Sequence, residues 1–227
     1  MNTSIEDIER RADETIMLHH AYVDEILHLN PPKSVRTSVI LDCFLLSTEL
    51  HVAIGTLVKF RHFAAAFALL RPLIETTLRA AWLTYVADYK SLMMTIENKS
   101  TNDLDYFARA LLKRTTHLEL HSIANTILDN RHIYHSLTHC GLEQLARRRE
   151  GFKPDDLISG LITADAFAII SGEVAHFSNK ECKFREITIA NAFRLAKENY
   201  LRTGLGEEPP ETWTGELPEP PSWNDPE

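Results

Sequence analysis

Apolar residues recur along most of this chain at the three- to four-residue spacing of an amphipathic helix. The clearest case is 61–88, RHFAAAFALLRPLIETTLRAAWLTYVAD, where apolar side chains cover most of the helix circumference and predict a central, buried helix. Yet Arg71, Glu75 and Arg79 stand in its middle at i, i+4 and i+8, on one helical face, where unpaired charge would be costly. Pro72 predicts a kink beside them, or a helix that begins anew with Pro72 in its first turn. The pattern therefore predicts either an internal ion-pair ladder or the wall of a polar site.

Helical periodicity organises the rest of the chain as well, with serine caps, prolines and polar loops at the expected ends. The expected segments are 4–28, 34–58, 61–88, 89–116 with a loop at 98–102, 117–129, a short piece ending near 149, 155–178 and 184–203. Asp129 and Asn130 are expected to end the helix over 117–129, and the histidine-rich stretch after them to be irregular or only briefly helical. The sequence thus predicts an all-α fold, a bundle of about seven helices.

The composition changes sharply after residue 203. Residues 204–227 are rich in Pro and Glu, contain two tryptophans and lack Lys and Arg. They hold seven of the 32 acidic residues, so the body before them, with 25 acidic and 24 basic residues, is nearly neutral. Such a segment cannot form a core, and we expect it to be disordered or extended against the body, with Trp213 and Trp223 as anchors. The chain is therefore interpreted as one helical domain, 1–203, with an acidic tail that could bind a partner protein.

Length and cysteine usage favour a cytoplasmic protein without a membrane span. The 227 residues suffice for one domain with a substantial core. The N-terminus has no apolar signal region, and the uncharged runs of the central helix fall far below the roughly 18 apolar residues of a membrane helix. Cys43, Cys140 and Cys182 are widely spaced and form no CxxC pair, as expected in a reducing compartment.

The charged stripe of the central helix is the first candidate for chemistry. If Glu75 pairs with both Arg71 and Arg79, the stripe is purely structural. If one arginine faces a cavity, its planar guanidinium suits a phosphate or a carboxylate. Two arginines and one glutamate leave one positive charge, which favours an anionic ligand.

The histidines are the second candidate. His135 and His139 are spaced i, i+4, so a helix would place both on one face, and Glu173 with His176 could complete a metal site. The Glu that a metalloprotease carries after its first His is missing, and no spacing fixes a third ligand. No metal or cofactor is therefore expected. Three further arginines, at 147–149, either favour a helix C-terminus or form a phosphate-contacting patch.

The segment ALLRPLIETTLRAAWL, followed by LTHCG and EVAHFS, resembles uncharacterised bacterial all-helical proteins, some of them grouped with HEPN-like proteins of abortive-infection and toxin–antitoxin systems. The resemblance covers about residues 35–180 and implies a helical bundle, often a homodimer. For catalytic members it implies a metal-independent ribonuclease in which an Arg and a His of an Arg-x4-6-His motif meet across the dimer. Here that spacing occurs once, from Arg114 to His121. Chance alone predicts about two such matches in a chain of this composition. Thr115 follows the Arg in place of the residue that is usual in the motif. The catalytic signature is thus not demonstrated.

On this basis we expect an HEPN-like bacterial defence or stress protein that acts on or binds RNA or a nucleotide. The alternative is a non-catalytic, homodimeric helical interaction module with a structural ion-pair ladder; a metal-dependent helical enzyme is a third hypothesis. The sequence does not decide whether the protein is an enzyme. The candidate catalytic residues are Arg79, His139 and His176, and the candidate ligand-binding residues are Arg71, Glu75 and His135.

Overall fold

The computed structural model describes residues 4–97, 99, 103–115, 118–138, 145–146, 149–178, 180, 182–203, 217, 219–223 and 225. Within these residues the named elements are all helices and no strand occurs, which confirms the predicted all-α fold. The helices are α1 (Ile5–Ile26), α2 (Val35–Lys59), α3 (Phe63–Tyr85), α4 (Tyr89–Ile96), α5 (Leu104–Arg114), α6 (Leu118–Thr138), α8 (Pro154–Ser178) and α9 (Phe184–Thr203).

The first two helices begin at the predicted serines. The Ser4 hydroxyl accepts a hydrogen bond from the Asp7 N–H, and the Asp7 carboxylate accepts one from the Ser4 N–H. Ser34 and Thr37 form the same reciprocal pair at the start of α2. Each capping box satisfies donors that have no partner inside the helix, so both boundaries were predictable from sequence.

One of the two alternatives predicted at Pro72 is excluded, and the interruption predicted at Asp129 is wrong. Helix α3 runs continuously through Pro72, so it does not begin anew there, and the kink stays a prediction. Helix α6 runs through Asp129 and Asn130, and the Asn130 side-chain amide donates to the Thr126 carbonyl one turn earlier, at 2.8 Å. Buried Ile127 lies beside this point, so packing holds α6 through residues that favour a turn.

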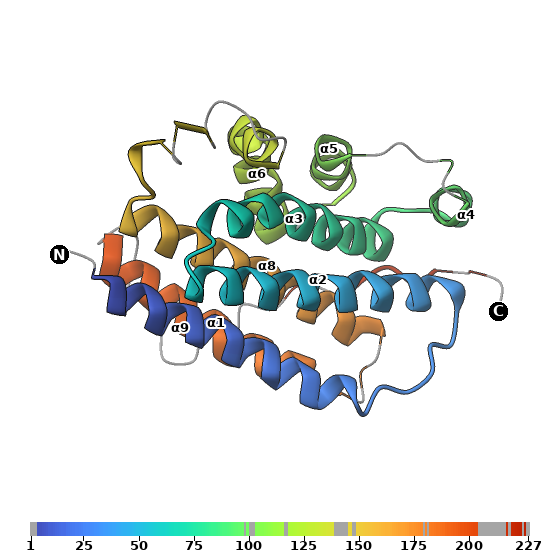
Figure 1. Cartoon of the computed structure of the whole chain (residues 1–227). Coiled ribbons are helices and arrows are strands. Elements are labelled where there is room, and N and C mark those ends of the chain that lie inside the picture. Colours follow the sequence, from blue (N-terminus) through green and yellow to red (C-terminus); the bar gives the residue numbers. More distant parts are fainter. Residues whose placement is uncertain are drawn as a thin grey trace.

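The central pair of the bundle is α2 and α3, which lie side by side with a short connection (Figure 1). Helix α8 covers this pair from behind, α1 and α9 lie on one side, and α5 and α6 lie on the other side against α3. Leu73, Ile74, Leu78 and Trp82 of α3 are almost completely buried. Since each such side chain contributes about 1.5–3 kcal/mol on burial, α3 anchors the core as predicted.

Helices α2 and α8 are each long and apolar enough to cross a membrane by length and composition. In this structure 50% of the most apolar window of α2 and 72% of that of α8 is buried inside the bundle. Core helices of soluble proteins have the same properties, so this is weak evidence for a membrane span. The cytoplasmic location stays a prediction.

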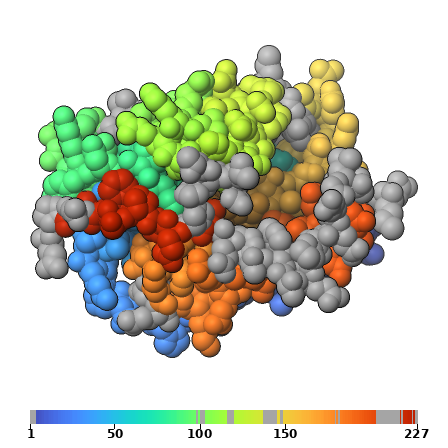
Figure 2. Space-filling model, turned by 180° about the vertical axis from the view of Figure 1, so that it is seen from behind, coloured from blue at the N-terminus to red at the C-terminus, as the bar shows by residue number. Residues whose placement is uncertain are grey.

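The described tail residues lie extended against the helical body. Leu217 is buried, and the Trp223 indole N–H donates to the Thr84 carbonyl at the end of α3, at 2.8 Å. Figure 2 shows this segment in red on the surface between the green α4–α5 region and the orange α8–α9 region. Trp223 therefore anchors the tail as expected, whereas 204–216, with Trp213, lies outside the described residues.

Gly172 of α8 allows a close approach of α8 to α1. A Cβ atom at this position would lie 2.4 Å from Oη and 2.6 Å from Cζ of Tyr22. Tyr22 cannot move aside easily, because its buried ring contacts Phe44 and Phe184 and its hydroxyl shares a 3.2 Å hydrogen bond with Thr188. The glycine thus lets α1 and α8 pack closely around a fixed tyrosine.

We expect Gly172→Ala to lower the free energy of unfolding by about 1–3 kcal/mol, because the added methyl group overpacks a fixed site. Urea denaturation followed by circular dichroism measures this change. The matched control is Ser159→Ala on the exposed face of the same helix, which should stay within about 0.5 kcal/mol of the unmodified chain. Equal urea midpoints for Gly172→Ala and the control would contradict this packing.

Candidate functional site

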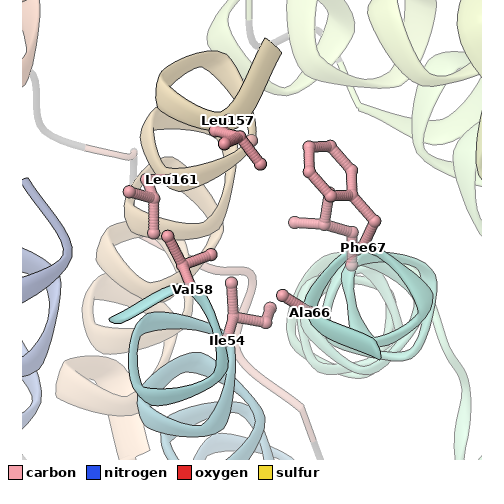
Figure 3. A pocket seen from close by; sticks show the side chains of 8 residues that line it. Ile54, Val58, Ala66, Phe67, Leu157 and Leu161 are labelled. Carbon is pink, nitrogen blue, oxygen red and sulfur yellow. The ribbon is translucent and has the colours of Figure 1, made fainter. Parts of the chain in front are cut away.

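A small hollow between α2, α3 and α8 has an entirely apolar lining (Figure 3). A pocket that orients a substrate needs a few convergent polar groups. This hollow offers none, so it is a packing gap and the polar chemistry lies elsewhere. Its lining residues are Ile54, Val58, Ala66, Phe67, Leu70, Leu157, Gly160 and Leu161.

The stripe of α3 lies at a half-exposed surface. The side chains of Arg71, Glu75 and Arg79 are 16%, 26% and 37% exposed. Arg79 Nη2 lies 3.4 Å from one Glu75 oxygen, and Arg71 Nε lies 4.0 Å from the other. Both contacts are long, and pairs at this exposure contribute little to stability. The stripe is therefore a weakly paired, partly exposed set of charges and not a fully buried ladder.

Arg71 contacts His135 of α6 directly. Its Nη1 donates to His135 Nδ1 at 2.5 Å. Because a guanidinium has no acceptor, Nδ1 must be the acceptor in this contact and the ring proton lies on Nε2. The structure thus brings three predicted ligand-binding residues, Arg71, Glu75 and His135, to one place.

Arg79 retains unused hydrogen-bonding capacity. Its guanidinium lies over the Phe107 ring of α5, 5.4 Å from the centroid. Its Nε is buried and has no hydrogen-bond partner among the described residues. A buried N–H without a partner is costly. A ligand would contact the exposed part of the guanidinium, because the Arg79 side chain is 37% exposed.

The cationic surface extends to residues that we did not single out as a site. Arg131 lies one turn before His135 on α6, and its guanidinium is 3.7 Å from the Asp105 carboxylate of α5. Arg109 approaches the same carboxylate at 3.9 Å. Both arginines are exposed, and their contacts with Asp105 connect α5 to the part of α6 that precedes His135 by one turn. The basic surface is defined by Arg71, Glu75, Arg79, Asp105, Arg109, Arg131 and His135, with four arginines against two carboxylates.

The predicted catalytic histidines do not join this surface in the described part of the chain. His176 lies on α8 near Arg185 and Lys180; burial and these two cations lower its pKa. No contact among the described residues joins His176 to Arg79. His139 lies outside the described residues, as do two of the arginines at 147–149. Within the described ranges, no three His, Cys, Asp or Glu side chains are grouped as a metal site.

The Arg-x4-6-His spacing has a structural use. His121 Nε2 donates to the Thr115 carbonyl at 2.7 Å, and Thr115 is the residue that ends α5. The histidine therefore links the end of α5 to α6 and satisfies a carbonyl there. Arg114 is exposed at the last turn of α5, where the helix dipole favours a cation.

A buried charge network does exist, around Asp165 of α8, and the sequence analysis missed it. Its Oδ1 accepts from His51 Nε2 of α2 at 2.8 Å, and its Oδ2 accepts from Arg11 Nη2 of α1 at 2.8 Å and from Arg194 Nη2 of α9 at 3.0 Å. Asp165 and His51 are 0% exposed, and Arg11 is 2% exposed. Glu198 of α9 also accepts from Arg11. One carboxylate thus connects four helices.

The Asp165 carboxylate is ionised, and the protein itself satisfies its charge and its hydrogen bonds. Burial alone would raise the pKa of Asp165, but the hydrogen bond from His51 and the charge of Arg11 outweigh it and hold this pKa well below its usual range. Both oxygens already accept hydrogen bonds from the protein, so the carboxylate has little left to offer a substrate. We therefore interpret the network as structural. A sequence signal existed: Arg11 shares the apolar stripe of α1 with Ile8 and Thr15.

We expect Asp165→Asn to destabilise the fold by about 3 kcal/mol or more at pH 7, because it leaves buried Arg11 without its main counter-charge. Urea denaturation measures the loss. Asp24→Asn is the control: Asp24 is an exposed carboxylate on α1, and its change should be within about 0.5 kcal/mol. A loss below 1 kcal/mol, about the size of a surface pair, would refute the structural role.

The loss of unfolding free energy at acid pH should depend on the same carboxylate. The Asp165 pKa is lower in the folded state than the unfolded value of about 3.9, so its contribution is present above that pH and is lost as pH falls. The stability gap between the unmodified chain and Asp165→Asn should therefore narrow below pH ~4, by roughly 1 kcal/mol per pH unit. Urea midpoints between pH ~3 and ~7 test this. A constant gap would mean that folding does not shift the pKa of Asp165, and would contradict this account.

Residues 44–191 match the model of a family of unknown function (DUF6988). No curated protein and no solved structure matches the chain significantly. The matched range includes the whole basic surface, together with His51 and Asp165, while Arg11 and Arg194 lie outside it. Since the match covers more than half of the 227 residues, the chain belongs to this family of unknown function.

Proposed function

We propose that this protein binds RNA or a nucleotide through the basic surface, as an HEPN-like bacterial defence or stress protein. The observation that carries the proposal is the contact between Arg71 and His135, with the partly exposed Arg79 two turns further along α3. Arginine and histidine donors at a half-exposed surface match the chemistry of a phosphate-bearing ligand.

The ion pairs of the stripe leave the arginines available. Glu75 is held at 3.4 Å by Arg79 and at 4.0 Å by Arg71, so a phosphate oxygen can form shorter, charge-assisted bonds to either guanidinium. Four arginines against two carboxylates leave two positive charges in excess on the basic surface. Each phosphate that such a surface neutralises releases counterions, which favours binding at low salt.

An aromatic side chain beside this surface favours an RNA over an isolated phosphate. Tyr106 of α5 is exposed, next to Phe107, and its ring contacts Trp82 at a centroid distance of 5.9 Å. Unstacked RNA bases bind on aromatic faces, while arginines contact the adjoining phosphates. Tyr106 and Arg79 both contact the Phe107 ring.

The arrangement suits binding better than strand cleavage. A general base for the ribose 2′-hydroxyl must present a free lone pair. The Nδ1 lone pair of His135 accepts from Arg71, so this nitrogen is not free to act as a base. His135 is therefore assigned a binding role within this proposal.

The HEPN resemblance enters the proposal in modified form. It implies an Arg and a His that meet across a dimer, whereas here Arg71 of α3 and His135 of α6 meet within one chain. The homodimer remains part of the proposal, because a second copy would double the cationic surface offered to one RNA. The rival proposal is a non-catalytic, homodimeric interaction module in which the stripe only stabilises the fold.

A binding experiment separates these two proposals. Arg71→Gln with Arg79→Gln should weaken binding of a fluorescent single-stranded RNA of about ten nucleotides at least tenfold. The salt slope of log K should fall by about one per arginine removed, because fewer phosphates are neutralised. Fluorescence anisotropy at several salt concentrations measures both quantities.

The control is Arg10→Gln, which removes an exposed arginine of α1 that also forms i, i+3 and i, i+4 pairs. It should leave both affinity and salt slope nearly unchanged. Binding that falls equally in the control and the double variant would point to non-specific attraction and reject the site. A double variant that binds normally but unfolds at much lower urea concentration would favour the rival module.

A further inference from the structure

The C-terminal end of α3 is the starting point, because its last carbonyl groups have no partner within the helix. Leu83 and Thr84 supply two of these carbonyls, and Ala87 supplies a third just beyond the helix. Together they form an acceptor patch at the negative end of the helix dipole, which favours cationic and N–H donors. Two donors fill it: one from the start of α2 and one from the C-terminal tail.

The donor from α2 is Arg36, which is only 4% exposed. Its Nη1 donates to the carbonyls of Leu83 at 2.6 Å and Ala87 at 2.8 Å. Its Nε and Nη2 face the other way and donate to the Asp225 carboxylate, with 2.9 Å between Nη2 and Oδ1. The guanidinium thus connects the end of α3 to one acidic residue of the tail. A planar, bidentate donor of this kind selects a carboxylate by geometry as well as by charge.

The donor from the tail is Trp223. Its indole N–H donates to the Thr84 carbonyl at 2.8 Å, and its ring lies against the Arg36 guanidinium, 4.5 Å from the centroid. In an extended segment, side chains two positions apart point to the same side, so Trp223 and Asp225 can contact Arg36 at the same time. Arg36 therefore contacts an aromatic ring and a carboxylate that are two residues apart in the tail.

We propose that Arg36 and the end of α3 form a peptide-binding site for tryptophan followed two residues later by a carboxylate. Its ligand is this chain's own C-terminal segment, residues 217–227, docked reversibly. The partner class is thus an acidic, proline-containing peptide. The proposal is independent of the basic surface, which uses the middle of α3 together with α5 and α6.

The segment has the properties of a peptide ligand. Pro220 and Pro221 restrict its backbone to extended conformations, so docking costs little further ordering. Its described residues form no helix or strand, and their contacts are few and specific: Leu217 is buried, and Glu219 accepts from exposed Lys180 at 3.0 Å. Figure 2 shows the segment lying on the surface of the body. Recognition therefore rests chiefly on Arg36.

The sequence contains a natural control for this recognition. The stretch EPPETWTGE, within 207–216, echoes EPPSWND but carries Gly215 two positions after Trp213. A peptide of residues 207–216 has four acidic residues, against three in 217–227, so general charge attraction cannot favour the latter. Selective recognition of 217–227 would therefore depend on the placement of Asp225.

The test uses the full chain with its own segment disabled by Trp223→Ala and Asp225→Ala. This vacated chain should bind a fluorescent peptide of residues 217–227, measured by anisotropy. The same peptide with Asp225→Asn, and the 207–216 peptide, should each bind about tenfold more weakly or worse, because they lose a charge-assisted bond to Arg36. The unmodified chain should also bind the 217–227 peptide at least tenfold more weakly, because its tethered segment competes at high effective concentration.

Circular dichroism and urea denaturation establish that the vacated chain is folded. A folded vacated chain that fails to bind the 217–227 peptide would overturn the proposal. So would equal affinity for the 217–227 and 207–216 peptides, or equal affinity of the vacated and unmodified chains. Binding lost on adding Arg36→Gln to the folded vacated chain would support the assignment of the arginine.

Discussion

The fold depends on one buried carboxylate that must stay charged and fully hydrogen-bonded. Asp165 accepts from His51, Arg11 and Arg194, and these four side chains come from four different helices. A buried charge is tolerated only when its partners are in place, so the network fixes how α1, α2, α8 and α9 sit together. Tyr22 against Gly172 adds a steric constraint between α1 and α8.

The charged residues of α3 differ from this buried network in exposure and in pairing. Arg71 and Arg79 are partly exposed and weakly paired, and Arg79 Nε has no partner in the described part of the chain. Arg36, at the far end, is instead completely engaged, between the end of α3 and Asp225. One apolar helix thus supports an open cationic surface at its middle and an occupied peptide contact at its end.

Local signals were predictable from the sequence, and tertiary pairings were not. Ser4 and Ser34 cap helices through neighbours three residues away, so their role is readable from the chain alone. The continuation of α6 through Asn130 depends on packing that outweighs a turn preference. The stripe of Arg71 and Glu75 was recognised by spacing, and His135 was named, but their burial and contact required the packing of α6 on α3. Asp165 escaped notice because its three partners lie 29 to 154 residues away.

The central claim is that the basic surface binds the ligand while the Asp165 network only holds the fold. Hydrogen–deuterium exchange of the full chain with and without a single-stranded RNA tests it most directly, because amide protection reports locally on both regions. The account predicts slower exchange on RNA addition around Arg71–Arg79 of α3 and Arg131–His135 of α6, with the amides around Asp165 unchanged. Protection confined to α8 and α9, or no protection at saturating RNA, would contradict it.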